Sequence, residues 1–325
     1  MSKNFGLPYM GSKNRIAKEL ITEIIWNEPN AQIFIDLFAG GCAMSHAAIL
    51  SGKFKKVIAN DINAMPKLFK DAILGKYRDE KRWISRDEFH KLKDTDMYVK
   101  SCWSFGNRGA TYMYGEHLEP YKKAYHYARV FGDFSLFNQF APYIEKENSG
   151  NLRKYIKDNY ERIKKDYINW FIANITKDTE KLQNYKFKSL QRLERLQSLQ
   201  GLQRLQSLER LQSLERLESL ESDTLEISQG SYQDFKLPKA DECVIYCDIP
   251  YKGTQAYNHD GAKISFDYEA FYNWVRDKAK DGYKIYISEY QMPSDFKEIL
   301  TIDTNSRLND KSPKKVKEKL FKYEN

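Results

Sequence analysis

The chain has 325 residues, of which 41% are hydrophobic and 14% aromatic, enough for one large domain or one domain with a substantial insertion. Its formal net charge of +8 favours a polyanionic partner such as nucleic acid, although a basic soluble protein without such a partner shows the same balance. No apolar run approaches the roughly 18 residues of a membrane span, and the first six residues are polar, so we expect a cytoplasmic protein.

The four cysteines and five histidines are not spaced like metal ligands. Cys243 and Cys247 lie in an apolar run and do not form a C-x-x-C pair, and no histidine pairs with a cysteine at the spacing of a zinc site. We therefore predict no metal and expect reduced cysteines.

The first 61 residues alternate between helical and strand patterns. An amphipathic helix within residues 8–26 precedes a buried strand over 33–38, which ends in the glycine turn 39–41. A helix over 43–50 and a strand over 56–61 follow. The order of strand, glycine turn, helix, strand and acid is half of a doubly wound, Rossmann-like α/β sheet.

The middle of the chain breaks this alternation and then returns to it. Residues 64–100 and 118–180 predict helices, separated by a loop over 101–118 that is rich in glycine and aromatic residues. The α/β pattern resumes with the apolar strand at 243–247, followed by a helix at 267–280 and a strand at 283–288. A lysine-rich segment closes the chain.

Leucine occupies every third position from Leu190 to Leu220. In an α-helix each leucine would fall about 60° behind the last, whereas a 3₁₀ helix would align them but is uncommon at this length. The spacing excludes a heptad coiled coil, and a strand would scatter the leucines over both faces. We predict an elongated helical insert that acts as a spacer. Its near-identical triplets are typical of a tandem repeat in the coding DNA.

The turn from Asp36 to Gly41 follows a strand and contains small residues that let a backbone approach a ligand closely. It lacks the G-x-G-x-x-G and Gly-Lys-Ser/Thr patterns of nucleotide folds. Asp61, at the end of the next strand, is placed to bind ribose hydroxyls. An ordinary tight turn and a helix cap explain each feature alone, but together they predict a nucleoside-containing cofactor.

Residues 248–251 read Asp-Ile-Pro-Tyr directly after the apolar strand. The Asp248 carboxylate and the Ile249 carbonyl offer two hydrogen-bond acceptors to an amino group, and Tyr251 offers a flat face for stacking. This set suits the exocyclic amine of a nucleobase. Taken alone, the segment is better explained as a strand that ends in a turn, with an aspartate cap and a proline breaker.

Five segments, in this order, resemble the Dam-like (alpha-group) DNA adenine-N6 methyltransferases. They are Pro8–Lys13, Asp36–Gly41, Asn60–Asp61, Ser104–Arg108 and Asp248–Tyr251. The resemblance implies a Rossmann-like, S-adenosylmethionine-dependent methyltransferase sheet with S-adenosylhomocysteine as product. It also implies a catalytic domain over 1–85 and 226–325 and a mostly helical target-recognition insertion over 86–185, with the leucine repeat over 186–222 as a further insert.

The resemblance assigns roles residue by residue. It implies that Tyr9, Gly11 and Lys13 line the methionine end of the cofactor, and that Asp36, Phe38 and Gly40 hold its amino-acid portion. It implies further that Asp61 binds the ribose and that Asp234 and Phe235 contact the adenine of the cofactor. For catalysis it implies Asp248, Ile249, Pro250 and Tyr251, with Asp248 also beside the cofactor. The sequence departs from the family's usual Asp-Pro-Pro-Tyr at Ile249, which keeps a carbonyl but loses the rigidity of proline.

The loop after residue 101 supplies the candidate DNA contacts Asn107, Arg108 and Tyr112, since Asn and Arg read base edges and Tyr stacks. A packing role for this loop is an equal alternative. The basic stretch from Arg153 to Lys165 suits phosphate contact or a solvated face.

The leading interpretation is DNA adenine-N6 methylation with base flipping, in the cytoplasm of a bacterial or phage-infected cell. The implied partners are double-stranded DNA and, left open, a cognate restriction endonuclease. DNA cytosine-N4 methylation uses the same amine chemistry, although Asp248 favours adenine. Methylation of RNA or of a glutamine side chain, and a catalytically silent DNA-binding relative, are the remaining alternatives.

Overall fold

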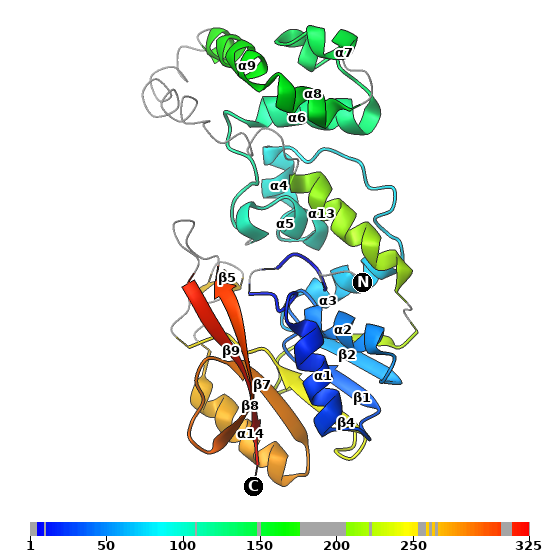
Figure 1. The fold of residues 1–325 in the computed structure, drawn as a ribbon, viewed down its shortest axis with the longest axis vertical. Helices are drawn as coiled ribbons and strands as arrows, with labels where there is room; N and C mark the ends of the chain where they lie inside the picture. Colours follow the sequence, from blue (N-terminus) through cyan, green and yellow to red (C-terminus); the bar gives the residue numbers. More distant parts are fainter. Residues whose placement is uncertain are drawn as a thin grey trace. The chain divides into compact units, whose positions relative to one another are not determined.

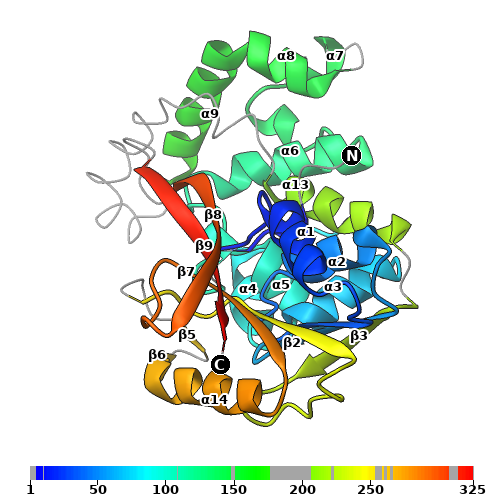
Figure 2. The same ribbon diagram turned by 60° about the horizontal axis from the view of Figure 1, so that its bottom comes forward.

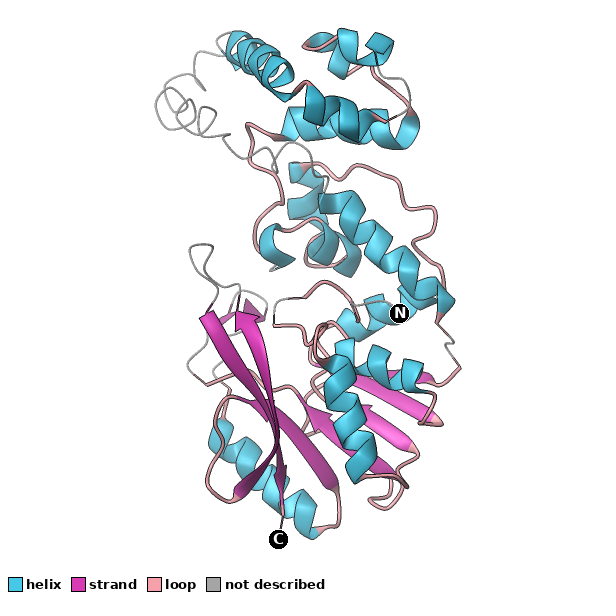
Figure 3. Cartoon of the chain, viewed as in Figure 1, coloured by secondary structure: helices cyan, strands magenta, loops and turns pink. Residues whose placement is uncertain are grey.

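The computed structural model describes the chain except residues 1–4, 10, 108, 148–150, 176–205, 221–222, 253–257, 260–261, 264–265, 307–313 and 325. The chain forms two compact units (Figure 1). The first, Met1–Arg78 with Ser213–Asn325, is called the sheet unit below, and the second, Asp79–Gln212, the helical unit. Among the described residues, the named strands all belong to the sheet unit (Figure 3).

Seven strands of the described residues form one sheet in the order β3-β2-β1-β4-β7-β9-β8. In that order they run over Leu225–Gln229, Lys56–Asp61, Ile33–Asp36, Cys243–Cys247, Lys284–Glu289, Lys314–Tyr323 and Phe296–Ser306. The first five are parallel to their neighbours, and β9 is antiparallel to both β7 and β8. A separate two-stranded pair consists of β5 (Asn258–His259) and β6 (Ala262–Lys263).

Helices cover both faces of the central strands (Figure 2). The helices of the sheet unit are α1 (Ala17–Asn27), α2 (Ala43–Ser51), α3 (Met65–Ile73), the short 3₁₀ helix η3 (Arg216–Ser219) and α14 (Tyr268–Lys280). Figure 2 shows α14 on one side of the sheet and α1 and α2 on the other. Burial on both faces explains why β1 and β4 read as continuous apolar runs, since a parallel sheet covered by helices has no solvent face.

The alternation of side chains along these strands assigns the two faces. Ile35, Ile245 and Ile285 lie in one core cluster with Phe271 and Val275 of α14. Their chain neighbours point to the opposite face, where the rings of Phe34 and Tyr246 lie 6.4 Å apart.

The strand order reverses around β1. From β1 the chain crosses to β2 on one side, whereas β4 lies on the other side of β1. In an open α/β sheet, ligands bind in the crevice at the carboxyl ends of the strands beside such a reversal. The last residues of β1, β2 and β7 are Asp36, Asp61 and Glu289, and Asp248 directly follows β4. The fold therefore gathers acidic side chains at one edge of the sheet.

Several elements differ in detail from the predicted pattern. The first helix begins only at Ala17, because residues 8–9 and 11–16 form turns and loop. β3 and the long β8–β9 hairpin were not predicted, and the lysine-rich end of the chain forms β9. The lysines of β9 obscured its strand pattern, although Leu320 and Phe321 are both buried. The mixed α/β class is confirmed.

The described part of the helical unit contains a series of short helices and an isolated antiparallel bridge between Ser104 and Tyr112. Its helices are α4 (Arg86–Leu92), α5 (Met97–Cys102), η1 (Phe105–Asn107), α6 (Glu119–Phe131), η2 (Phe137–Gln139), α7 (Tyr143–Glu147), α8 (Leu152–Asp158) and α9 (Tyr160–Ile175). The sequence starts α4 with a capping box, in which Ser85 and Glu88 satisfy each other's backbone amides. Tyr121, Phe137 and Tyr167 are fully buried in the core around α6 and α9.

The predicted leucine-repeat insert lies mostly outside the described residues, which resume at Gln206. From there the repeat forms α13 (Gln206–Glu215), which continues as the 3₁₀ helix η3. Its last leucines, Leu211, Leu214, Leu217 and Leu220, are all buried. Leucines three residues apart drift around an α-helix, which has 3.6 residues per turn, but stay on one side of a 3₁₀ helix, which has 3.0 residues per turn. The change from α13 to η3 therefore keeps the leucines on one side for longer than an α-helix alone would.

The four cysteines are buried and free. None of the helices in the described part of the chain is long and apolar enough to cross a membrane.

Candidate functional site

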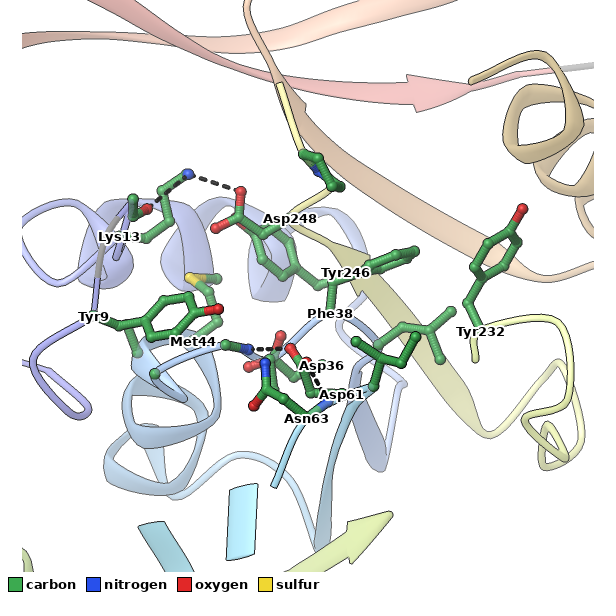
Figure 4. A pocket seen from close by; sticks show the side chains of 18 of the residues that line it. Tyr9, Lys13, Asp36, Phe38, Met44, Asp61, Asn63, Tyr232, Tyr246 and Asp248 are labelled. Carbon is green, nitrogen blue, oxygen red and sulfur yellow. Dashed lines mark hydrogen bonds and ion pairs between the residues drawn. The ribbon is translucent and has the colours of Figure 1, made fainter. Parts of the chain in front are cut away.

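A cavity of about 310 Å³ opens at the carboxyl ends of β1, β2, β3 and β4. Figure 4 shows side chains from the loops after these strands gathered around it, together with Tyr9 and Lys13 from the N-terminal segment. Of the sequence-predicted cofactor residues, the cavity is lined by Tyr9, Gly11, Lys13, Asp36, Phe38, Gly40, Asp61 and Asp248. The structure therefore brings together residues from positions 9 to 248 of the chain.

The glycine loop is shaped by the N-terminal segment that packs against it. Gly40 has a φ of +46°, and a Cβ there would lie 2.9 Å from the Tyr9 ring. A Cβ on Gly41 would lie 2.8 Å from the Leu7 carbonyl oxygen, and the Leu7 amide donates to the Gly41 carbonyl at 2.7 Å. Glycine is favoured at both positions, because an added Cβ would meet the Tyr9 ring at Gly40 and the backbone of the N-terminal segment at Gly41.

Asp36 ends β1 and is almost completely buried. Its Oδ2 accepts hydrogen bonds from the Ser45 amide (3.0 Å) and the Ser45 hydroxyl (2.7 Å), at the start of α2. Burial raises the pKa of Asp36 to about 7 against the lowering effect of Ser45, and the charges of Asp248 and Asp61 add to the rise. A positive ligand group in the cavity would therefore be stabilised by this carboxylate.

Asp61 ends β2 and ties two loops together. Its Oδ2 accepts the Gly40 amide at 2.7 Å, and its Oδ1 accepts the Asn63 amide at 3.0 Å. These contacts fix the orientation of the Asp61 carboxylate at the edge of the cavity.

Asp248 follows β4 and forms an ion pair with Lys13. The Lys13 Nζ lies 2.7 Å from Asp248 Oδ1, with 6% of the lysine side chain and 21% of the aspartate side chain exposed (Figure 4). Burial raises the pKa of Asp248 to about 6, and Lys13 opposes that rise. The carboxylate is therefore mostly ionised at neutral pH and can accept a hydrogen bond.

The other residues of the tetrapeptide Asp248–Tyr251 lie partly at the cavity and partly in the core. Pro250 lines the cavity, whereas the Ile249 side chain is 2% exposed and packs in the core cluster under α14. The Tyr251 hydroxyl donates to Glu318 Oε2 at 2.6 Å, and Lys13 Nζ lies 4.5 Å from the centroid of the Tyr251 ring. Burial raises the pKa of Tyr251 well above its ordinary value, so its hydroxyl stays protonated.

Asp234 and Phe235 follow the lining residue Gln233 but do not themselves line the cavity. Asp234 is exposed and Phe235 packs against the core cluster under α14. The preceding residues line the cavity instead, and Tyr232 packs on Phe38 with ring centroids 5.4 Å apart. Several lining residues had no role assigned from the sequence, namely Met44, Asn63, Ser231, Tyr232, Gln233, Phe266 and Asp267. Residues 230–233 follow the carboxyl end of β3, which brings them to the same edge of the sheet. Recognition of β3 in the sequence would have pointed to them.

A model of the D12 class N6 adenine-specific DNA methyltransferase family matches residues 9–306. The chain belongs to this family. The match confirms the predicted resemblance to Dam-like adenine methyltransferases and identifies the chain as an enzyme of DNA adenine methylation. A search of curated proteins found no match.

Family membership implies S-adenosylmethionine as the methyl donor of this methyltransferase. Among the described residues, no group of three or more His, Cys, Asp or Glu side chains is arranged to hold a metal ion.

The predicted DNA contacts of the methyltransferase lie in the helical unit. Arg108 is outside the described residues, and Asn107 ends η1, with its side chain outside the description. Tyr112 is 4% exposed. Its hydroxyl donates to the Ile84 carbonyl at 2.7 Å, so this residue holds the loop to the rest of the unit.

Proposed function

We propose that this methyltransferase transfers a methyl group from S-adenosylmethionine, bound in the cavity of the sheet unit, to the N6 amine of an adenine flipped out of double-stranded DNA. The observation that carries the proposal is the position of Asp248, whose carboxylate lines the same cavity as the glycine loop and Asp61. A hydrogen-bond acceptor for the target amine and a site for a nucleoside cofactor therefore share one cavity.

The chemistry of the lining residues suits the cofactor. S-adenosylmethionine carries a positive sulfonium centre, and the cavity presents the carboxylates of Asp36, Asp61 and Asp248 beside one lysine, Lys13. Asp36 and the loop at Gly40 would hold the amino-acid portion, and Asp61 the ribose. When bound, the cofactor supplies an electrophilic methyl group.

Tyr232 and Asn63 are the lining residues best suited to the nucleobase of the cofactor. Tyr232 offers a partly exposed ring packed on Phe38, and Asn63 lies on the short loop between Asp61 and α3. We propose them in preference to Asp234 and Phe235, which do not line the cavity.

The amine of adenine is a weak nucleophile because its lone pair is delocalised into the ring. We propose that Asp248 and the Ile249 carbonyl accept its two hydrogens and favour a pyramidal nitrogen. Lys13 binds Asp248 Oδ1, and within the described part of the chain Oδ2 has no hydrogen-bond partner, so this oxygen is available to the substrate. A charged acceptor fixed before the reaction lowers the barrier without reorganisation.

A base within the duplex cannot reach this cavity, so the target must be extruded. We propose that the flipped adenine stacks on Tyr251, a contact worth about 1–3 kcal/mol per base. Once the target site is mapped, a mismatch opposite the adenine should tighten DNA binding, because the base is already unpaired. Equal affinity for matched and mismatched sites would argue against flipping.

We further propose that the sheet unit is catalytic and that the helical unit recognises the target DNA. The loop around Asn107 and Arg108 supplies candidate base contacts, with Tyr112 supporting it. Arg153, Lys154 and Lys157 are exposed on α8, where they suit phosphate contact. Charge removal on α8 should weaken binding to all sequences equally and reduce its salt dependence, whereas substitution of Asn107 should change the preferred sequence.

The test of the activity is incorporation of labelled methyl groups from S-adenosylmethionine into unmethylated DNA, with Asp248→Ala as the control. Label in adenine supports the proposal. Label in cytosine would assign N4 methylation to the same cavity, and absence of label in DNA would remove the proposal.

A further inference from the structure

Tyr251 is held at two points by residues from other strands of the sheet unit. Its hydroxyl donates to Glu318 Oε2 of β9 at 2.6 Å. Its ring meets Tyr290, which follows β7, with centroids 4.5 Å apart and planes at 79°. Edge-to-face packing of this kind fixes a ring against rotation and tilt.

The backbone after Tyr251 is held by a second glutamate. Glu289 ends β7 and is 1% exposed. Its Oε2 accepts the Lys252 amide at 3.1 Å, and its Oε1 accepts the Tyr290 amide at 2.7 Å. Glu289 thus joins the strand that carries Tyr290 to the residue that follows Tyr251.

The sequence of the proposed catalytic tetrapeptide, Asp248–Tyr251, explains why these contacts are needed to hold it in place. Proline fixes its own φ angle, and the second residue of this segment, Ile249, lacks that restraint. The Ile249 side chain is buried in the core, which anchors the start of the segment. The end of the segment, where the stacking ring lies, is anchored by Glu289 and Glu318.

We propose that Glu318 is a positioning residue that fixes the ring of Tyr251 for stacking on the flipped base, with Glu289 holding the adjacent backbone. The inference rests on the proposed function of Tyr251 and extends it to a residue of β9, 67 positions away. Glu318 acts through the hydroxyl of Tyr251 and takes no part in the methyl transfer itself.

Three variants separate positioning from a general role in folding. Glu318→Ala removes the acceptor, Tyr251→Phe removes the donor and keeps the ring, and Glu318→Gln keeps an acceptor oxygen. Glu298→Gln is the matched control, because Glu298 lies on β8 in the same hairpin and pairs with Lys319 at the surface. Activity is measured about two pH units above the Asp248 pKa of about 6, so that this carboxylate is ionised in every variant.

We expect Glu318→Ala and Tyr251→Phe each to lower kcat/KM for DNA by about 10- to 100-fold, because a misplaced stacking surface loses orientation. The double variant should lose no more than either single variant, since both remove one interaction. Glu318→Gln and Glu298→Gln should stay within about threefold of the wild type. S-adenosylmethionine affinity, measured by calorimetry, should be unchanged in all of them.

Full activity of Tyr251→Phe would overturn the inference, even if Glu318→Ala failed to fold. Additive losses in the double variant would also overturn it, because Glu318 would then act independently of Tyr251. If the wild-type enzyme itself transferred no methyl group to DNA, the proposed function would fail. An active wild type with an unaffected Glu318→Ala variant would refute only the positioning role.

Discussion

The Lys13 Nζ lies 2.7 Å from Asp248 Oδ1, although the two residues are 235 positions apart in the chain. The pair joins the N-terminal segment, which also shapes the glycine loop, to the strand end that carries the proposed catalytic carboxylate. The same ammonium lies over the ring of Tyr251. The Lys13 ammonium therefore interacts electrostatically with Asp248, beside the proposed cofactor site, and with Tyr251, the proposed stacking residue for the target base.

Removal of Lys13 should shift the pH dependence of the reaction. The proposed mechanism uses the ionised carboxylate of Asp248 as a charged acceptor, so we expect kcat to fall as the pH drops through about 6. Lys13 lowers the pKa of Asp248 against the effect of burial, so in Lys13→Met this acidic limb should move to higher pH. Measured pH–rate profiles test this, with Lys53→Met, an exposed lysine, as the control. An unmoved limb would mean that Lys13 does not control Asp248.

Cofactor affinity should also depend on pH, through Asp36. Burial raises the pKa of Asp36 to about 7, so close to that pH about half of the molecules carry a neutral Asp36. A cationic ligand favours the ionised form, so affinity for S-adenosylmethionine should rise as the pH increases through 7, with proton release on binding. Calorimetry in buffers of different ionisation enthalpy measures that release. The release should disappear in Asp36→Asn; its persistence there would place the titrating group elsewhere.

Gly40→Ala should weaken cofactor binding by about tenfold or more. Its Cβ would lie 2.9 Å from the Tyr9 ring, and its positive φ adds about 1–2 kcal/mol of strain for a residue with a side chain. Gly52→Ala is the matched control, because Gly52 has a φ of +63° but no atom within 4 Å of an added Cβ. Both variants should lose some thermal stability, and only Gly40→Ala should lose S-adenosylmethionine affinity. Equal cofactor affinity in the two variants would show that the contact with Tyr9 does not shape the site.

Ile249→Ala should destabilise the protein more than it alters the reaction. The Ile249 side chain is 2% exposed in the core under α14, so its truncation should cost about 2–5 kcal/mol of unfolding free energy. In the proposed mechanism the residue acts through its carbonyl, which any side chain leaves in place, so kcat of the folded enzyme should change less than tenfold. Denaturant titration and kinetics at low temperature measure the two effects. A large loss of kcat at unchanged stability would assign the side chain a direct catalytic role.

The residues that short-range patterns describe were predictable from the sequence. Asp36, Asp61 and Asp248 each follow an apolar run that forms a buried parallel strand, and such strand ends meet at one edge of the sheet. The order of these motifs also indicated the family. The hydrophobic pattern and the order of the motifs agree here because both reflect the same structural requirement, an acidic edge of the sheet beside a glycine turn.

Contacts between distant segments were not predictable. Glu318 lies in a lysine-rich run that gave no strand signal, and only the pairing of β9 with β7 brings it to Tyr251. Tyr112 reads as an exposed stacking residue in a glycine-rich loop, yet its hydroxyl is bound within the unit. Tyr232 was assigned no role from the sequence, and only the pairing of β3 with β2 brings residues 230–233 to the cavity. In each case the environment of the residue depends on contacts with a distant segment, and the local sequence does not indicate which segment that is.

The central claim is that Asp248 activates the N6 amine of adenine in DNA. Its most direct test is mass spectrometry of the nucleosides released from unmethylated DNA after incubation with S-adenosylmethionine and either the wild type or Asp248→Ala. We expect N6-methyladenine with the wild type and a loss of at least about 10²- to 10³-fold with Asp248→Ala, whose S-adenosylmethionine affinity should be largely kept. N6-methyladenine at wild-type levels from the Asp248→Ala variant would contradict the claim.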